Sequence, residues 1–258
     1  MLHISPFLSA YVLTLTALLG LVMGSFLNAW AWRIAHGESI VHGRSHCAHC
    51  GHTLAPRDLV PLFSWLALKG RCRYCGAPIS PRYPAVELIS CLYFLSVVLR
   101  YDVSWTALRF LLLGALLLTA ALVDLDTMLL PDGLQLAAAL TALLRLAEEG
   151  WAGLKDGLLG ALCLFVPLLL VVLLMDKLMK RDTMGGGDLK LLALLGLHFG
   201  PLQGLFLLLV SCALGLLFAL LGRKGRGVEF PFGPALVAAM WLTALFGEGA
   251  VHWYLGLF

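Results

Sequence analysis

Apolar runs long enough to cross a lipid bilayer recur along the whole chain. The 258 residues are 60% hydrophobic and 13% charged, with a mean hydropathy of +0.92, whereas soluble domains carry about 25% charged residues. A bilayer core of ~30 Å takes about 20 helical residues. Since a backbone in lipid must satisfy its own hydrogen bonds, we expect these runs to be helices. The sequence therefore predicts an all-α polytopic membrane protein.

Eight segments qualify as candidate crossings, although the fourth and sixth are short. We expect the first to be a retained helix, because no basic stretch precedes it and no small-residue cleavage site follows it. This pattern predicts a first transmembrane helix over 1–34, a cytoplasmic zinc-binding loop domain over 35–83 and a membrane-embedded domain over 84–258. The candidate segments are 8–32, 84–100, 105–124, 133–147, 154–176, 187–200, 202–221 and 234–256.

Basic residues give these crossings an orientation. With the loop domain in the cytoplasm, fourteen Lys and Arg residues fall on that side and four on the other, in agreement with the positive-inside rule. A missed helix would destroy this asymmetry, so the split supports both the orientation and eight crossings. The cytoplasmic set is Arg33, Arg44, Arg57, Lys69, Arg71, Arg73, Arg82, Lys177, Lys180, Arg181, Lys190, Arg223, Lys224 and Arg226, and the outer set is Arg100, Arg109, Arg145 and Lys155.

Two Cys-x-x-Cys pairs lie in the polar loop, and each is followed by a glycine that allows a tight turn. Two such pairs supply four thiolates to one tetrahedral zinc ion, and metal binding would stabilise a loop of ~50 residues that has no core of its own. A pair of disulfides is disfavoured in a reducing cytoplasm. The predicted ligands are Cys47, Cys50, Cys72 and Cys75.

Five histidines crowd the first cysteine pair. These histidines could serve as alternative metal ligands. Because four cysteines already suffice for one zinc ion, we expect the histidines to be solvated or to contact the membrane surface or a substrate. They are His36, His42, His46, His49 and His52.

Three carboxylates fall within DLDTMLLPD, residues 124–132, at the end of an apolar run. A charged residue inside a membrane costs ~2.5–3.5 kcal/mol on insertion scales, so such acids call for an explanation. Asp132 follows a proline and is predicted to be the N-cap of the next helix. Asp126 is either a solvated interfacial residue or a support for a site. Asp124 is the deepest and the hardest to explain as a cap.

Asp188 follows three glycines, residues 185–187. An N-cap role is available to it as well, but successive glycines also allow another backbone to approach closely. The predicted topology places Asp124 and Asp188 at the same face and depth. Two close carboxylates cannot both ionise cheaply, so one can activate water while the protonated one polarises a scissile carbonyl. We therefore predict that Asp124 and Asp188 form an aspartic-protease dyad.

Ordered sequence blocks strengthen this interpretation. Besides the two cysteine pairs and the two acidic blocks, the chain contains GSFLN at 24–28, RYPAVEL at 82–88 and PFGP at 231–234. Together they resemble the type IV prepilin peptidase family. The chain departs from the family pattern just after Asn28, where it reads AWAWRIA.

The resemblance implies an inner-membrane, multi-pass aspartic endopeptidase. Such an enzyme cuts the leader of type IV prepilins or type II secretion pseudopilins after a glycine on the cytoplasmic side. It then N-methylates the new N-terminal residue, often phenylalanine, with S-adenosylmethionine. By this resemblance, Asp124 and Asp188 are the catalytic acids and one structural zinc is bound per chain. The implied partners are prepilins or pseudopilins and membrane lipids, with no nucleic acid.

Alternatives remain open at this point. A peptidase without methylation would keep the zinc loop for docking, and a transporter or assembly factor would use acids as a proton path. A relay would spread its acids through the membrane depth, whereas these gather at one face. The residues that bind the methyl donor are not assigned. Asn28, Glu38 and Glu87 are polar residues near the zinc loop that merit testing.

Overall fold

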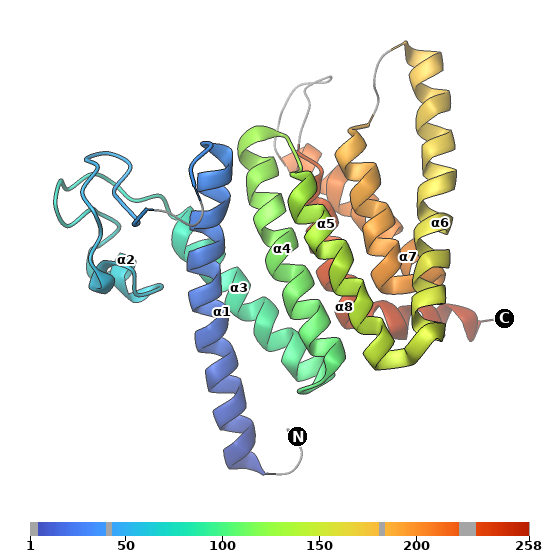
Figure 1. Ribbon diagram of the computed structural model, residues 1–258, viewed down its shortest axis with the longest axis horizontal. Coiled ribbons are helices and arrows are strands. Elements are labelled where there is room, and N and C mark those ends of the chain that lie inside the picture. The colour runs from blue at the N-terminus through green and yellow to red at the C-terminus, as the bar shows by residue number, and fades with distance from the viewer. Residues whose placement is uncertain (1–4, 40–42, 181–183, 222–230, 258) are drawn as a thin grey trace. The chain divides into compact units, whose positions relative to one another are not determined.

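The structure is a computed structural model that describes residues 5–39, 43–180, 184–221 and 231–257. Every regular element in those ranges is a helix (Figure 1), which confirms the all-α prediction. Six helical stretches are long and apolar enough to cross a membrane, so the chain is a membrane protein. His42, Arg181, Arg223, Lys224 and Arg226, which were assigned above, lie outside the described residues.

The chain divides into two compact units, Met1–Val103 and Ser104–Phe258. The division into 1–34, 35–83 and 84–258 stays a prediction, since it concerns function and membrane immersion.

In the first unit, helix α1 (Pro6–Ala35) packs against helix α3 (Arg82–Tyr101). Gly20 and Gly24 lie one turn apart on the buried face of α1. A Cβ at Gly24 would lie 2.7 Å from the Cα of Glu87 in α3. Small residues at this spacing let two membrane helices approach backbone to backbone. Asn28, one turn further along α1, continues the same buried face.

In the described part of the loop between these helices, the regular elements are the short η1 (Pro56–Asp58) and α2 (Phe63–Ala67). From residue 43 to 81, Gly70 and Cys72 are the only buried residues. The loop is tied to α3 by the Leu62 N–H, which donates to Oε2 of Glu87 at 2.7 Å. A segment with so little buried apolar area cannot fold by hydrophobic burial alone.

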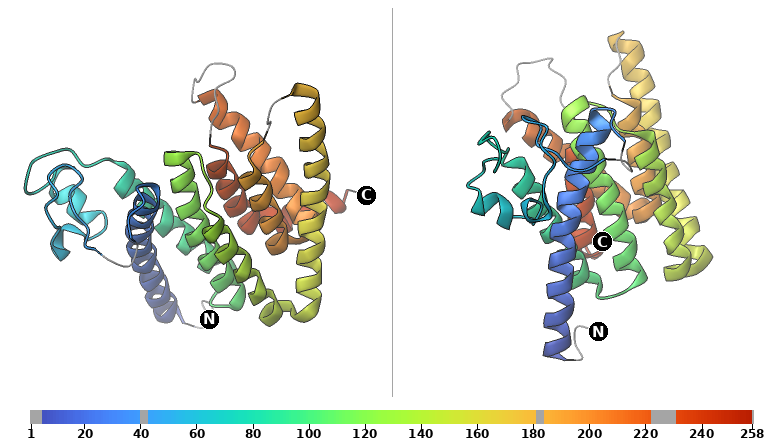
Figure 2. Two further views of the ribbon diagram at one scale, coloured as in Figure 1. Left: turned by 45° about the horizontal axis from the view of Figure 1, so that its top comes forward. Right: turned by 60° about the vertical axis from the view of Figure 1, so that its left-hand side comes forward.

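The second unit is a bundle of α4 (Trp105–Thr127), α5 (Asp132–Thr141), η2 (Ala142–Leu144), α6 (Arg145–Met179), α7 (Gly186–Leu221) and α8 (Gly233–Leu255). Helix α4 contacts α5, α6 and α8, and α7 packs against α6 and α8 (Figures 1 and 2). Leu113 and Leu117 of α4 are fully buried. Outward side chains such as Leu178 and Leu209 are exposed and apolar, as expected of a surface that faces lipid.

Helices α6 and α7 each contain one residue with non-helical backbone. Gly150 has φ 65° and ψ −152°, and Gly200 has φ 70° and ψ −176°. Only glycine adopts such angles without strain. In Figure 1 the chain turns back between α5 and the long upper part of α6. The two breaks fall where the sequence analysis separates 133–147 from 154–176 and 187–200 from 202–221.

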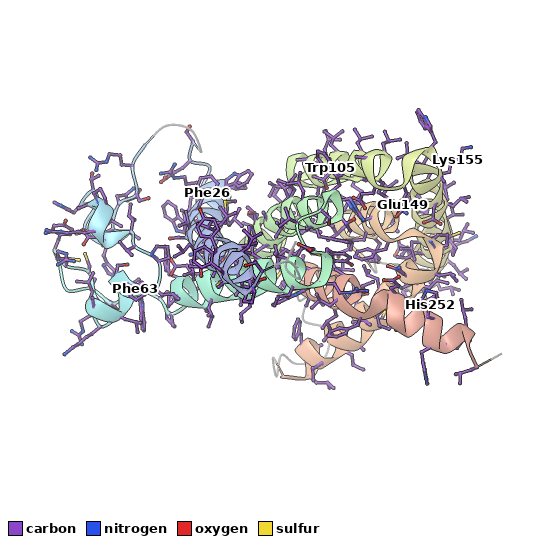
Figure 3. The ribbon with its side chains drawn as sticks, turned by 90° about the horizontal axis from the view of Figure 1, so that it is seen from below. Phe26, Phe63, Trp105, Glu149, Lys155 and His252 are labelled. Carbon is purple, nitrogen blue, oxygen red and sulfur yellow. The ribbon has the colours of Figure 1, made fainter. Side chains whose placement is uncertain are left out.

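A buried ionic network lies at the end of the unit where α4 begins, the end viewed in Figure 3. Arg109 donates from Nε and Nη2 to the two carboxylate oxygens of Glu148, at 2.7 and 3.0 Å. Nη1 of Arg109 donates to the His198 carbonyl at 3.0 Å. Arg145 donates to the carbonyls of Leu197 and His198 at 3.1 and 3.2 Å.

This network has a clear structural role. The break at Gly200 leaves the last carbonyls of the preceding helical segment without helical partners, and cationic side chains are favourable at such a C-terminus. Arg109 and Arg145 are only 4% and 5% exposed. Their burial and pairing explain why these two arginines are present, and the side of the membrane on which they lie stays a prediction.

Candidate active site and metal centre

Asp124 lies at the C-terminal end of α4 and is only 5% exposed. Its Oδ2 accepts a hydrogen bond from the N–H of Gly233 at 2.9 Å. Gly233 is the first residue of α8, and the free N–H groups at a helix N-terminus favour a neighbouring negative charge. A Cβ at Gly233 would lie 2.7 Å from that carboxylate oxygen, so a larger residue here would displace the carboxylate.

Asp188 lies in the first turn of α7 and is half-buried. It is within Coulombic range of Asp124. Leu130 links the surroundings of the two acids, because Cβ positions built at Gly187 and at Gly233 each lie 3.2 Å from its side chain. Three sequence blocks far apart in the chain therefore meet around Leu130.

The glycines before Asp188 expose the backbone. Gly185 and Gly186 are exposed, and a Cβ at Gly186 would meet nothing within 4 Å. The N–H of Asp188 donates to the Gly185 carbonyl at 3.1 Å, which fixes the acid at the start of the helix. Among the residues that the structure describes, the backbone beside the carboxylate is therefore open.

Asp132 does not cap its helix, so that prediction is wrong. The capping position of α5 is Pro131, and the Asp132 side chain makes no capping hydrogen bond. The extended backbone of Pro131 (ψ 123°) starts the helix at Asp132 itself. Oδ1 of Asp132 instead accepts from Nζ of Lys190 at 2.7 Å, in a pair that is largely exposed. Asp126 is also exposed.

The four predicted metal ligands lie together. The Sγ atoms of Cys47, Cys50, Cys72 and Cys75 are all within 4.8 Å of one another, and those of Cys47 and Cys75 are 3.9 Å apart. Four sulfurs around a tetrahedral zinc, each ~2.3 Å from the ion, would be about 3.8 Å apart. This cluster can hold a metal ion, and among the described residues it contains only cysteines.

The two cysteine pairs form the same turn twice. Gly51 donates to the Cys47 carbonyl at 2.8 Å, and Gly76 donates to the Cys72 carbonyl at 3.0 Å. Both glycines have positive φ, 69° and 72°, a conformation that favours glycine after each pair. Because both turns have the same backbone geometry, both sulfurs of each pair point toward the centre of the four-cysteine cluster.

The sulfurs differ in how readily they ionise. The backbone N–H of Cys50 donates to the Cys47 sulfur, and this lowers the pKa of the Cys47 thiol to about 6 despite burial, which raises it. At Cys75 the N–H of Ala77 lowers the pKa, but burial and the neighbouring thiols raise the pKa of Cys75 to about 11. Four close thiols resist full ionisation.

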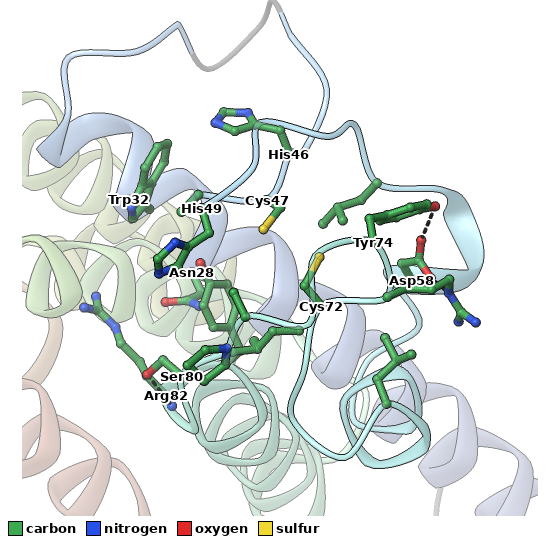
Figure 4. Close-up of a pocket in the computed structure, with 18 residues that line it drawn as sticks. Asn28, Trp32, His46, Cys47, His49, Asp58, Cys72, Tyr74, Ser80 and Arg82 are labelled. Atoms are coloured by element: carbon green, nitrogen blue, oxygen red, sulfur yellow. Dashed lines mark hydrogen bonds and ion pairs between the residues drawn. The ribbon is translucent and has the colours of Figure 1, made fainter.

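A cavity of about 380 Å³ lies beside the cysteines, within the first unit (Figure 4). The sequence alone gave no prediction of this cavity. Of the three polar residues singled out near the loop, Asn28 lines this cavity, Glu87 binds the Leu62 N–H and Glu38 is exposed. The spacing of Asn28 from Gly24, one turn along a buried helix face, was the available signal.

Comparisons with known proteins relate both units of the chain to the same kind of peptidase. Residues 18–101 match the bacterial Peptidase A24 N-terminal domain, and residues 111–220 match the Type IV leader peptidase family. No solved structure matched the chain.

Three relatives illustrate how far the similarity extends. The chain is 37% identical to a type 4 prepilin-like proteins leader peptide-processing enzyme of Escherichia coli O78:H11, over 88% of this chain and 93% of that protein. It is 39% identical to a prepilin leader peptidase/N-methyltransferase of Aeromonas hydrophila, over 82% of this chain and 74% of the relative. A protein of the same name from Pseudomonas aeruginosa is 36% identical, over 95% of this chain and 94% of that protein.

Proposed function

Because the chain belongs to the type IV leader peptidase family, we propose that it is a bifunctional prepilin leader peptidase and N-methyltransferase. Its substrates are type IV prepilins or type II secretion pseudopilins. It cleaves their leader after a glycine and then methylates the new N-terminal residue, often phenylalanine. The observation that carries this proposal is the approach of Asp124 and Asp188 around Leu130.

In the proposed cleavage step, Asp124 and Asp188 share one proton. The ionised carboxylate takes a proton from water, and the resulting hydroxide equivalent adds to the scissile carbonyl. The protonated carboxyl donates a hydrogen bond to that carbonyl oxygen. Collapse of the tetrahedral adduct breaks the C–N bond, and the departing amine takes up a proton. The open backbone at Gly185 and Gly186 admits the extended substrate.

The proposed enzyme crosses the inner membrane eight times. The breaks at Gly150 and Gly200 support this count, because each divides one long apolar helix into two segments. The basic residues then place the cysteine loop and both aspartates on the cytoplasmic side.

The cysteine cluster is proposed to hold one structural zinc ion. All four thiolates would bind it, which leaves no open position for a substrate. Its positive charge would let all four sulfurs ionise together. Its binding would stabilise the loop between α1 and α3, which buries almost nothing of its own.

The methylation step needs a methyl donor, which the proposal takes to be S-adenosylmethionine. When bound, this molecule supplies an electrophilic methyl group. The new N-terminal amine of the substrate would accept this methyl group from the sulfonium and would lose one proton.

The test uses purified full-length protein in detergent with a synthetic prepilin peptide that carries a Gly-Phe junction. With S-adenosylmethionine present, we expect two products, the free leader and a mature peptide heavier by about 14 Da, the mass of one added methylene. Cleavage without the added mass would support a peptidase that does not methylate. An intact peptide after prolonged incubation would contradict the proposal.

A further inference from the structure

One buried amide in the first unit has no hydrogen-bond partner. Asn28 is 4% exposed, and its side chain makes no hydrogen bond to any part of the protein that the structure describes. It lines the 380 Å³ cavity beside the cysteines. Its amide nitrogen and oxygen are not among the fully buried polar atoms that lack a partner, so they face the cavity, where a ligand can form hydrogen bonds with them.

The cavity has two chemically different sides. Figure 4 draws His49, Ser80 and Arg82 on the same side as Asn28, and Asp58 with Tyr74 on the other. Asp58 is already occupied, because it accepts from Nε of Arg73 at 2.7 Å and from the Tyr74 hydroxyl at 3.0 Å. Asn28, on the other side, makes no hydrogen bond within the described part of the chain, so its amide can bind a polar ligand.

We propose that this cavity is the binding site for S-adenosylmethionine. The inference rests on the proposed methyltransferase function and assigns that function to residues of the first unit. Its volume falls within the range of about 300–1,000 Å³ typical of small-molecule sites.

The lining side chains match the parts of this ligand. Arg82 carries a permanent charge suited to the carboxylate of the methionine moiety. Trp32, which stacks on His36, and Tyr83 also line the cavity, and aromatic rings of this kind suit the adenine ring and the sulfonium cation. The Asn28 amide, with two donor hydrogens and one acceptor oxygen, can pair with the edge of adenine.

The metal cluster supports the same cavity. Cys47 and Cys72 both line it, so the two turns that the metal would hold together form part of its wall. Disruption of the cluster should therefore weaken ligand binding without any contact between metal and ligand.

Calorimetric titration of the full-length protein in detergent with S-adenosylmethionine tests the assignment. Asn28→Ala should weaken binding at least tenfold. Ser90→Ala is the matched control, since Ser90 is a buried residue of the same unit whose hydroxyl also lacks a partner but which does not line the cavity. The affinity of Ser90→Ala for S-adenosylmethionine should equal that of the wild type. Metal content and melting temperature check that both variants are folded.

Direct ultraviolet cross-linking of the wild type to S-adenosylmethionine gives an independent readout. We expect labelled peptides that contain residues 28–32, 46–49 or 79–83. If the wild type binds but Asn28→Ala binds equally well, or if the label falls only within residues 104–258, the site assignment is overturned while the proposed function stands. A wild type that cleaves its substrate yet does not bind the donor overturns both the site and the methylation step.

Discussion

The two ends of α4 treat charge in opposite ways. Arg109 and Asp124 are 15 residues apart on this helix, which corresponds to about 22 Å along its axis. At the first end the guanidinium of Arg109 is matched to both oxygens of Glu148 and to a backbone carbonyl. At the other end Asp124 has one backbone N–H and lies near a second acid.

This difference in pairing distinguishes charged residues that stabilise the fold from charged residues that take part in catalysis. A buried ion pair is stable only if its remaining hydrogen-bonding groups are also satisfied, and the arginine network meets that condition. Two acids that face each other without a cation are unfavourable to folding, and perturbed groups of this kind cluster at functional sites. We therefore expect substitutions at the Arg109 end of α4 to lower stability and substitutions at the Asp124 end to lower activity.

The largest expected effect is on catalysis at the acid end. Asp188→Asn should lower the rate of leader cleavage by at least about 1,000-fold, as removal of one member of a catalytic unit commonly does. The melting temperature should stay the same or rise, because the change removes a like-charge contact. Cleavage and melting are measured on the same preparation. Equal loss of folded protein and of activity would make Asp188 structural.

At the arginine end the expected effect is on stability. Arg109→Met leaves Glu148 buried without its partner, which typically costs about 3–5 kcal/mol. Thermal unfolding in detergent should show a clear drop in melting temperature. The double variant Arg109→Met with Glu148→Met should be less destabilised than the single one. A double variant that is at least as destabilised as Arg109→Met alone would contradict the pairing of these two side chains.

The cysteine cluster extends the comparison to the first unit. Cys72→Ser should lower the zinc content from about one ion per chain to well below half and make the loop sensitive to protease, because the metal supplies much of its folding free energy. Elemental analysis and limited proteolysis measure the two effects. Cys212→Ser is the control, since this exposed cysteine lies outside the cluster. Full zinc retention by Cys72→Ser would rule out a four-thiolate site.

Packing without charge should have a smaller effect. Gly24→Ala would place a methyl group 2.7 Å from the Cα of Glu87, and overpacking of this kind costs about 1–3 kcal/mol. Gly249→Ala is the matched control, because a Cβ there meets nothing within 4 Å. A melting temperature lowered equally by both changes would show that helix α1 does not depend on close contact.

The smallest effect is expected at the exposed pair of Asp132 and Lys190. Exposed ion pairs contribute about 0–1 kcal/mol, so Lys190→Met should barely change the melting temperature. Cleavage should stay within a fewfold of the wild type. A loss of activity as large as that of Asp188→Asn would show that Lys190 takes part in catalysis, which would contradict its assignment as a surface residue.

Local sequence patterns predicted much of the fold. Long apolar runs define α1, α3, α4 and α8 within a few residues of their observed bounds, because lipid allows a spanning backbone to form little but helix. Asp124 and Asp188 were selected from a topology based on charge counts. The structure brings their surroundings together at Leu130, a contact across 57 residues that periodicity alone does not reveal.

The remaining features depend on tertiary contacts. Gly233 binds Asp124 from 109 residues away, and the PFGP block gave no reason to expect that its N–H is used. Asp132 looked like a cap because it follows proline, but the extended backbone of Pro131 makes Pro131 the capping position, and the Asp132 carboxylate pairs with Lys190. Charged residues inside apolar runs, such as Arg109 and Arg145, were the only sign of the buried network.

The most direct test of the paired acids compares Asp124→Asn, Asp188→Asn and the double variant in the same cleavage assay. Residues that act as one unit are not additive. We predict that each single change lowers the rate by at least about 1,000-fold and that the double variant is no slower, within a fewfold, than the slower single variant. A double variant whose loss equals the product of the two single losses, or a single variant with near-normal cleavage, would contradict the dyad.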